Sequence, residues 1–290
     1  MNHPKHDNWI MKILAAFTKH NPKFERYRPE KEDAFRYKTN GKIIIAVVAD
    51  GITRDPIGIK TRPEFSDKKA MKETASNYPR PSPAKIAANL FCESFIEYSE
   101  NKKINGILVK ESLLFANEQI YEKLNKKLKV DYLENDFAAC VGSAGLIGDN
   151  VLHCGYVADC GVCVFRNGKI AFITPNEGPD NRIDKVVREK YNTGFNYPKG
   201  RRIIRSLYRN NPKEPLSYGA FTGEDNALHF IRTYEFRLND RDIVMFYSDG
   251  MTSFINTEEF SRNLNNLESY IDDNLDKIAG AEATLVAILI

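Results

Sequence analysis

Two apolar runs of this chain each stop at the dipeptide Asp-Gly. Residues 42–53 read KIIIAVVADGIT, and residues 241–252 read RDIVMFYSDGMT. A continuous run of Ile, Val and other apolar residues is typical of a strand that is buried on both faces. We therefore expect Asp50 and Asp249 at the ends of two central strands, where the following glycine lets a ligand or another strand approach the backbone closely. Asp-Gly is also the commonest hairpin turn, so each dipeptide taken alone has that second interpretation.

Neighbouring strands would bring these two carboxylates to one point. Two negative charges at one point are unfavourable unless a cation or a proton lies between them, and a hard divalent cation with oxygen ligands solves that problem. A further acidic pair, Glu32-Asp33, precedes the first apolar run in the sequence YRPEKEDAF. Three acidic segments together favour a metal site over unrelated turns.

The rest of the chain alternates between helical and strand-like patterns without a linker rich in Gly, Pro or Ser. We expect long helices over 84–98, which begins after Ser82-Pro83, and 109–129, a helical segment over 258–274 and a short amphipathic helix over 9–17. The expected strands cover 137–146, 151–157, 162–166, 170–174, 216–222, 234–238, 243–248 and 283–290, with the middle ones forming a meander of hairpins. Strands at both ends bracket the helices, so the pattern predicts one α+β domain over 1–290.

Bulk charge and cysteine usage limit the partners and the compartment. A net charge of +3 gives no indication of a nucleic-acid or membrane partner, and no stretch has the ~18 apolar residues needed to cross a bilayer. The five cysteines are an odd number in a chain without a recognisable secretory signal, and Cys160 and Cys163 lack a second pair to complete a zinc site. We expect reduced core thiols and a cytoplasmic protein. The oligomeric state is not indicated.

The acidic motifs, taken in order, resemble the metal-dependent protein phosphatase family, the 2C class. The resemblance rests on Glu32-Asp33, the strand ending at Asp50-Gly51, GYVADCG at 155–161, the strand ending at Asp249-Gly250, and a last strand that contains Thr284. It implies two antiparallel β-sheets packed as a sandwich and flanked by helices on both sides, a four-layer αββα arrangement with a pair of manganese or magnesium ions at one end. It also implies that the irregular segment 175–215 is a variable flap beside the active site.

The resemblance also assigns roles to individual acidic residues. Asp50 would bridge both ions, Glu32 and the carbonyl of Gly51 would bind one ion, and Asp249 would bind the other. Asp33 would support these ligands. Asp159 matches an aspartate that lies near the metals in the family, and its alternative role is to cap a hairpin. Two ions roughly 3.5 to 4 Å apart can hold a nucleophilic hydroxide and neutralise phosphoryl oxygens during attack, so no covalent intermediate is needed.

Arginines are the expected substrate-binding residues. Arg28 matches the phosphate-binding arginine of the family, and a planar guanidinium can bind two phosphate oxygens at once; Arg26 is close enough to take that role instead. The basic run KGRRIIRSLYR over 199–209 has two interpretations, contact with a phosphoprotein or a solvated helix face.

Two departures from the family pattern bear on the chemistry. Ala281 stands where the family usually has an aspartate, and Glu282 follows it; on a regular strand its side chain would point to the opposite face. Glu282 can replace the aspartate if the strand starts only after it; other candidates are Asp272, Asp273 and Asp276. Ile52 occupies the position of a histidine credited with protonating the leaving group, so water would have to supply the proton.

The pattern as a whole predicts a metal-dependent phosphomonoesterase that hydrolyses phosphoserine or phosphothreonine in a phosphoprotein substrate with two divalent cations, Mn2+ or Mg2+. The alternative is a catalytically inactive domain of the same fold that acts as a regulatory or phospho-binding module. Ala281 is the main argument for the alternative, and the retention of the other acidic residues is the argument against it.

Overall fold

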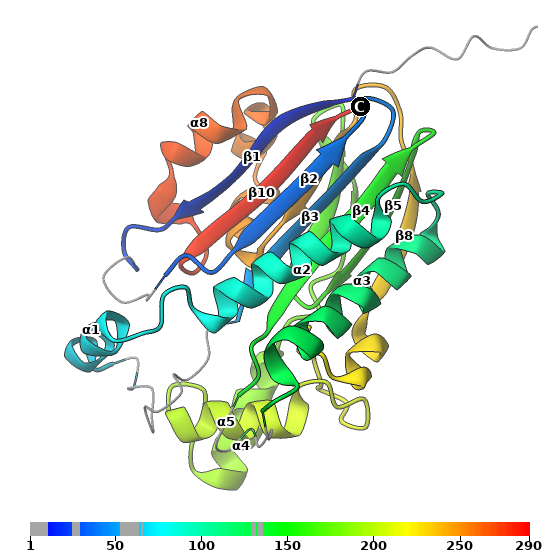
Figure 1. The fold of residues 1–290 in the computed structure, drawn as a ribbon. Helices are drawn as coiled ribbons and strands as arrows, with labels where there is room; N and C mark the ends of the chain where they lie inside the picture. Colours follow the sequence, from blue (N-terminus) through cyan, green and yellow to red (C-terminus); the bar gives the residue numbers. More distant parts are fainter. Residues whose placement is uncertain (1–10, 25–29, 53–63, 65, 129–131, 133–135) are drawn as a thin grey trace, which may run out of the picture.

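Two antiparallel five-stranded sheets form the centre of the computed structural model, which describes residues 11–24, 30–52, 64, 66–128, 132 and 136–290 (Figure 1). The first sheet has the order β1 (Lys12–His20), β10 (Glu282–Leu289), β9 (Ile243–Tyr247), β6 (Gly161–Arg166) and β7 (Lys169–Ile173). The second has the order β2 (Ala34–Thr39), β3 (Ile44–Gly51), β4 (Cys140–Gly148), β5 (Val151–Val157) and β8 (Arg232–Arg237). Every ladder between these strands is antiparallel.

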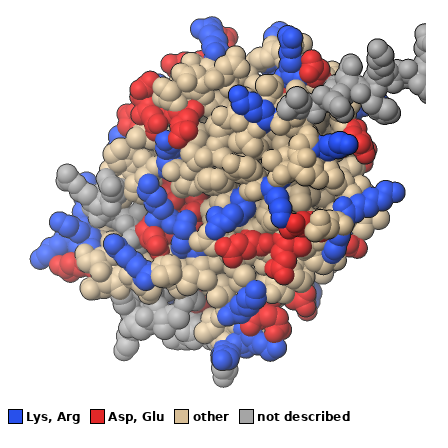
Figure 2. Space-filling model, turned by 45° about the horizontal axis from the view of Figure 1, so that its top comes forward, with Lys and Arg blue, Asp and Glu red and all other residues tan. Residues whose placement is uncertain are grey.

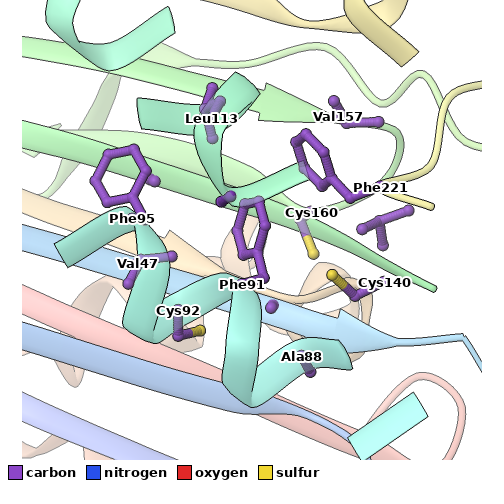
Figure 3. Close-up of a cluster of buried hydrophobic side chains, with 14 of the residues drawn as sticks. Val47, Ala88, Phe91, Cys92, Phe95, Leu113, Cys140, Val157, Cys160 and Phe221 are labelled. Atoms are coloured by element: carbon purple, nitrogen blue, oxygen red, sulfur yellow. The ribbon is translucent and has the colours of Figure 1, made fainter. Parts of the chain in front are cut away.

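Helices cover the outer face of each sheet. The long helices α2 (Pro83–Ser99) and α3 (Gly106–Ile120) lie across the second sheet, and Phe91, Phe95 and Leu113 pack there against Val47 and Phe221 (Figure 3). The first sheet is covered by α6 (Thr252–Ile255), α7 (Glu258–Arg262) and α8 (Leu267–Asp272). A short helix, α1 (Lys68–Ser76), precedes α2. The expected four-layer αββα sandwich is confirmed.

The side chains of β3 show how the layers are built. Ile44, Ala46 and Val48 point between the two sheets, where they belong to one apolar cluster with residues of β9 and β10. The alternate residues, Ile45 and Val47 among them, belong to the cluster beneath α2 and α3. Both faces of the strand are therefore buried, which explains why its sequence is continuously apolar rather than alternating.

Two hairpins of the expected meander are present, but the meander is not. Asp149-Asn150 joins β4 to β5 and Asn167-Gly168 joins β6 to β7, and all four turn residues have positive φ, as tight hairpin turns require. However, β5 and β6 lie in different sheets, so the chain crosses from one sheet to the other between them.

Three further expectations are wrong in detail. Residues 12–17 of the expected helix over 9–17 belong to strand β1, which pairs with β10 over its length. The α-helix expected over 109–129 ends at Ile120 and continues as a single π-helical turn over Tyr121–Asn125. Residues 216–222 do not form a strand and contribute only isolated β-bridges, including one between Phe221 and Cys140.

Residues 175–215 contain two helices, α4 (Asn181–Tyr191) and α5 (Pro198–Tyr208), which pack against each other around Ile183, Val187 and Ile204. In Figure 1 these helices lie at the lower end of the sandwich, next to the end of β3. Gly200 at the start of α5 touches the backbone of Gly194, where a Cβ would overlap.

Among the described residues, no helix is long and apolar enough to cross a membrane. Basic and acidic side chains are mixed across the face shown in Figure 2. All five cysteines are free and buried, as expected for core thiols.

Candidate active site

Most of the acidic residues singled out in the sequence meet where β3 ends and β10 begins, at the lower edge of the sandwich in Figure 1. The alternation of side chains along a strand determines which way each of them points. Phe35 points between the sheets and Ala34 points toward α2, so the preceding Asp33 faces inward and Glu32 faces the helix. Both carboxyl groups are buried, with 3% and 2% of the residue surface exposed.

Asp33 is held by the end of β9 in the opposite sheet. The Ser248 hydroxyl donates to Asp33 Oδ2 at 2.7 Å and accepts from the backbone N–H of Thr284 at 2.9 Å. Thr284 Oγ1 lies 2.8 Å from Thr18 Oγ1 of β1. The Ser248–Asp33 hydrogen bond thus links the two sheets, and the other two contacts join strands within the first sheet.

Glu32 is held by the N-terminus of α2. The Ser82 hydroxyl donates to Glu32 Oε1 and accepts from the backbone N–H of Lys85 at 3.0 Å, so one side chain caps the helix and fixes the carboxylate. Lys85 Nζ donates to the Asp33 carbonyl oxygen. Sequence reasoning identified Ser82 only as a helix cap.

Glu282 binds backbone amides. Its Oε1 accepts from the N–H of Glu32 at 2.7 Å, and its Oε2 accepts from the N–H of Asp33 at 3.2 Å. Strand β10 starts at Glu282 itself, and Thr284, Val286 and Glu282 fall on the same inward face. Glu282 therefore fastens the Glu32-Asp33 segment to the last strand.

The other acidic candidates for the missing aspartate lie on the surface. Asp272 pairs with Lys19 at 2.8 Å and Asp276 with Lys23 at 3.6 Å, while Asp273 is exposed. The structure does not bring them into the site.

The pKa of Asp50 is raised by burial and by the other acidic residues of the cluster. Loss of solvent raises its pKa well above the usual range, and the negative charges of Asp33, Asp249, Asp159 and Glu282 raise it further, in that order. The same loss of solvent raises the pKa of Asp33 and of Asp159. It also raises the pKa of Glu282 to about 8, with the charge of Asp33 as the next cause. The carboxyl groups therefore share one electrostatic environment, which favours a bound cation or retained protons.

The glycines of the two Asp-Gly dipeptides permit close backbone contact. A Cβ at Gly51 would lie 2.7 Å from the carbonyl oxygens of both Glu32 and Ala84. A Cβ at Gly250 would overlap the carbonyl oxygen of Glu282. Neither dipeptide is a hairpin turn, because Asp50-Gly51 ends β3 and Asp249 begins a 3-10 turn over Asp249–Met251.

A cavity of about 260 Å³ opens beside this acidic cluster. Asp50, Gly51, Ile52 and Asp159 line it. Arg201 and Arg205 of helix α5 and Arg209, the residue after it, also line the cavity, and the remaining lining residues are Val141, Ala158, Pro179, Phe195, Ile204 and Tyr218. The arginines of this helix are a part of the site that sequence reasoning left undecided.

The donor atoms of the cluster fit a hard divalent cation in chemistry, because they are carboxylate and carbonyl oxygens. The geometry is not that of an assembled site: in the part of the chain that the structure describes, no three His, Cys, Asp or Glu side chains are arranged to hold one ion. Ser82, Ser248 and backbone amides instead engage Glu32, Asp33 and Glu282. Arg28 and Arg26 lie outside the described residues.

Comparison with solved structures identifies the fold. A serine/threonine phosphatase from S. agalactiae matches with a TM-score of 0.61 at 13% identity, over 97% of this chain and 99% of that chain. The catalytic domain of the serine/threonine protein phosphatase PstP, solved with two manganese ions, matches with a TM-score of 0.58 at 13% identity, over 97% and 98% of the two chains. RsbX, solved with magnesium, matches with a TM-score of 0.54 at 10% identity, over 98% and 97%.

Comparisons with models of protein families and with curated proteins give no match. At these identities the structural likeness concerns the arrangement of the chain. It covers nearly the full length of both partners in each case. The resemblance in fold to the metal-dependent protein phosphatases of the 2C class is thereby confirmed, and this chain has the fold of a serine/threonine phosphatase catalytic domain.

Proposed function

We propose that this protein is a divalent-metal-dependent phosphomonoesterase that acts on phosphoserine or phosphothreonine in proteins. The observation that carries the proposal is the cluster of Asp33, Asp50, Asp159 and Asp249 at the end of the sandwich, beside a cavity. Burial raises the pKa of Asp33, Asp50 and Asp159, and neighbouring negative charges raise the pKa of Asp50 and Asp159 further, which is costly to the fold. A bound cation would offset that cost. PstP, a phosphatase of the same fold, has been solved with two manganese ions.

The residues of this chain would have separate roles in the reaction. Asp50 and Asp249 would hold the cations, Mn2+ or Mg2+, with Glu32 and the Gly51 carbonyl as further ligands. When bound, a pair of divalent cations supplies a water of lowered pKa and neutralises phosphoryl oxygens. Ser248 keeps Asp33 oriented at the level of Asp50. Ile52 lines the cavity, and its side chain has no ionisable proton. Solvent would therefore supply the proton that the leaving alcohol needs.

The surroundings of the site agree with a protein substrate in the cytoplasm. The cavity of about 260 Å³ is large enough for one phosphorylated side chain and open to a longer chain outside. Five buried free thiols suit a reducing compartment. A phosphoprotein is therefore the proposed partner.

A second candidate function has one observation in its favour. Ala281 leaves a carboxylate missing, and both oxygens of the neighbouring Glu282 accept backbone hydrogen bonds. A domain of this fold that binds phosphorylated segments without hydrolysing them would tolerate that arrangement. We favour the enzyme because the other acidic residues of the motif set are retained.

Hydrolysis of a small aryl phosphate tests the proposal. The measurement compares the parent protein with manganese, the parent with chelator, and Asp50→Asn with manganese. We expect activity only in the first case, and Glu111→Gln, an exposed residue of α3, should behave like the parent. Activity that ignores the chelator would exclude the proposed chemistry. Manganese binding without any turnover would support the binding module.

A further inference from the structure

Two arginines of α5, and a third directly after it, line the same cavity as Asp50. Arg201 and Arg205 are four residues apart in α5, so their side chains lie along one side of the helix, and Arg209 is the extended residue at its C-terminus. Only 5%, 7% and 4% of their respective surfaces are exposed. A solvated helix face, one interpretation of residues 199–209, is therefore wrong for these three residues.

Buried contacts hold the arginine side chains in place. Arg209 Nη1 donates to Asp136 Oδ1 at 2.9 Å, and Arg205 Nε lies 3.0 Å from Asp136 Oδ2. Arg201 Nη1 donates to the Phe195 carbonyl oxygen at 3.1 Å. A guanidinium keeps its charge even when it is buried, and one that is already positioned loses little entropy when it binds an anion.

The backbone ties α5 to the strand end that carries Asp50. After α5, the Asn210 N–H donates to the Tyr218 carbonyl at 2.9 Å. Phe221 then exchanges two hydrogen bonds with Cys140, of 3.1 and 2.8 Å, and Cys140 pairs with Gly51 in the ladder between β3 and β4. The arginine row and the acidic cluster thus belong to one framework.

The cavity is lined by acidic residues, Asp50 and Asp159, and by the arginines of α5 and its C-terminus; we call these two sets of lining residues its acidic end and its basic end. In the proposed reaction the phosphoryl group must reach the acidic end, at Asp50 and Asp159, where cations would bind. A different part of the substrate then occupies the basic end. Electrostatic complementarity favours a negative group there and disfavours a positive one.

We propose that Arg201 and Arg205 form an anion subsite that selects substrates with a carboxylate or a second phosphate beside the phosphorylated residue. The proposal rests on the proposed function, because it takes the acidic end as the place of reaction. It names a substrate class: phosphoserine or phosphothreonine segments with acidic or multiply phosphorylated surroundings.

Three matched phosphoserine peptides test the subsite. Their residues on both sides of the phosphoserine are alanine, aspartate, or a non-hydrolysable phosphonate analogue of phosphoserine. We expect kcat/KM to be about tenfold higher for the acidic peptides than for the alanine peptide, the effect of one charge-assisted hydrogen bond. Preference for the phosphonate peptide alone identifies phosphate as the recognised group, and preference for both acidic peptides identifies negative charge in general.

Variants of α5 show whether Arg201 is responsible. Arg201→Gln should bring the ratio of acidic to neutral peptide close to one, and Arg201→Lys should retain part of it. Arg202→Gln is the control, because Arg202 is on the same helix and does not line the cavity. Thermal unfolding of each variant verifies folding.

The subsite and the proposed function fail in different ways. Equal kcat/KM for the three peptides, or an acidic preference that survives in Arg201→Gln, overturns the subsite and leaves the phosphatase intact. No turnover of any peptide overturns the phosphatase. In that case, fluorescence anisotropy of the same peptides tests the subsite by their binding affinity. We expect the parent to bind the acidic peptides about tenfold more tightly than the neutral one, and Arg201→Gln to lose this difference.

Discussion

The variant Glu282→Gln tests how much the negative charge of Glu282 lowers the stability of the folded protein, apart from the hydrogen bonds that its side chain accepts. Burial, together with the charge of Asp33, raises the pKa of Glu282 from 4.5 to about 8. A carboxyl whose pKa is higher in the folded state binds a proton there that the unfolded chain has released. Between pH 4.5 and about 8 the folded protein without metal therefore loses stability as the pH rises.

The size of the effect follows from the shift. One group contributes at most about 1.4 kcal/mol per pH unit, which over a window of about 3.5 units gives an upper limit of about 5 kcal/mol. Glutamine removes this charge and keeps one acceptor for the Glu32 N–H. We expect the slope of stability against pH to decrease by about 1 kcal/mol per unit between about pH 6 and 8. Near pH 5 the variant should be less stable by about 1 kcal/mol, since one backbone hydrogen bond is lost.

Urea unfolding in the presence of chelator, at several pH values from 5 to 9, measures these slopes. The two proteins differ only at position 282, so the difference between the two curves reports that carboxyl group and its effect on the neighbouring carboxyls. Glu111→Gln, on the exposed side of α3, should keep the parent slope. The reasoning is refuted if the parent does not lose stability with rising pH, or if Glu282→Gln loses it equally fast.

Three further substitutions test the contacts around the site, each by the free energy of unfolding from urea titration. Gly250→Ala should destabilise by about 3 kcal/mol or more, because its Cβ would overlap the Glu282 carbonyl oxygen; a loss below about 1 kcal/mol would contradict this. Ser82→Ala should cost about 1–2 kcal/mol through the lost cap of α2 and the lost bond to Glu32, with Ser82→Thr as the variant that restores it. Asp136→Asn should cost about 3–5 kcal/mol, because it removes the carboxylate shared by two buried arginines, and a neutral result would show that those ion pairs are dispensable.

The sheet architecture could be predicted from the sequence where a segment carried its own signal. The continuous apolar runs at β3 and β9 and the turn dipeptides of two hairpins predicted those elements correctly. Residues 12–17 carried no such signal, since a short apolar run fits a helix or a strand equally well. Pairing with β10, more than 250 residues away, decides the matter in favour of β1.

The site was predictable to the extent that strand ends determine it. Strand alternation continues past the end of β9 and before the start of β2, which is why Ser248 and Asp33 meet between the sheets. The serine directly before Asp249 was the available signal. No comparable signal marked Arg201 or Arg205, because a helical pattern does not show whether a basic face meets solvent or a cavity formed by distant strands.

Ala281 and Glu282 show why the presence of acidic residues and catalysis are separate properties. Thr284, Val286 and Ile288 face inward, so Glu282 also faces inward and restores a carboxylate to the cluster. Both oxygens of Glu282 accept hydrogen bonds from backbone amides, however. Glu282 therefore adds negative charge to the cluster, but its oxygens are not free to bind a metal ion. An inactive module with this cluster would still lose stability as the pH rises, whereas only an enzyme would also hydrolyse phosphate in a manner that a chelator abolishes. The urea titration and the aryl phosphate assay therefore answer different questions, and only the second can distinguish the two proposed functions.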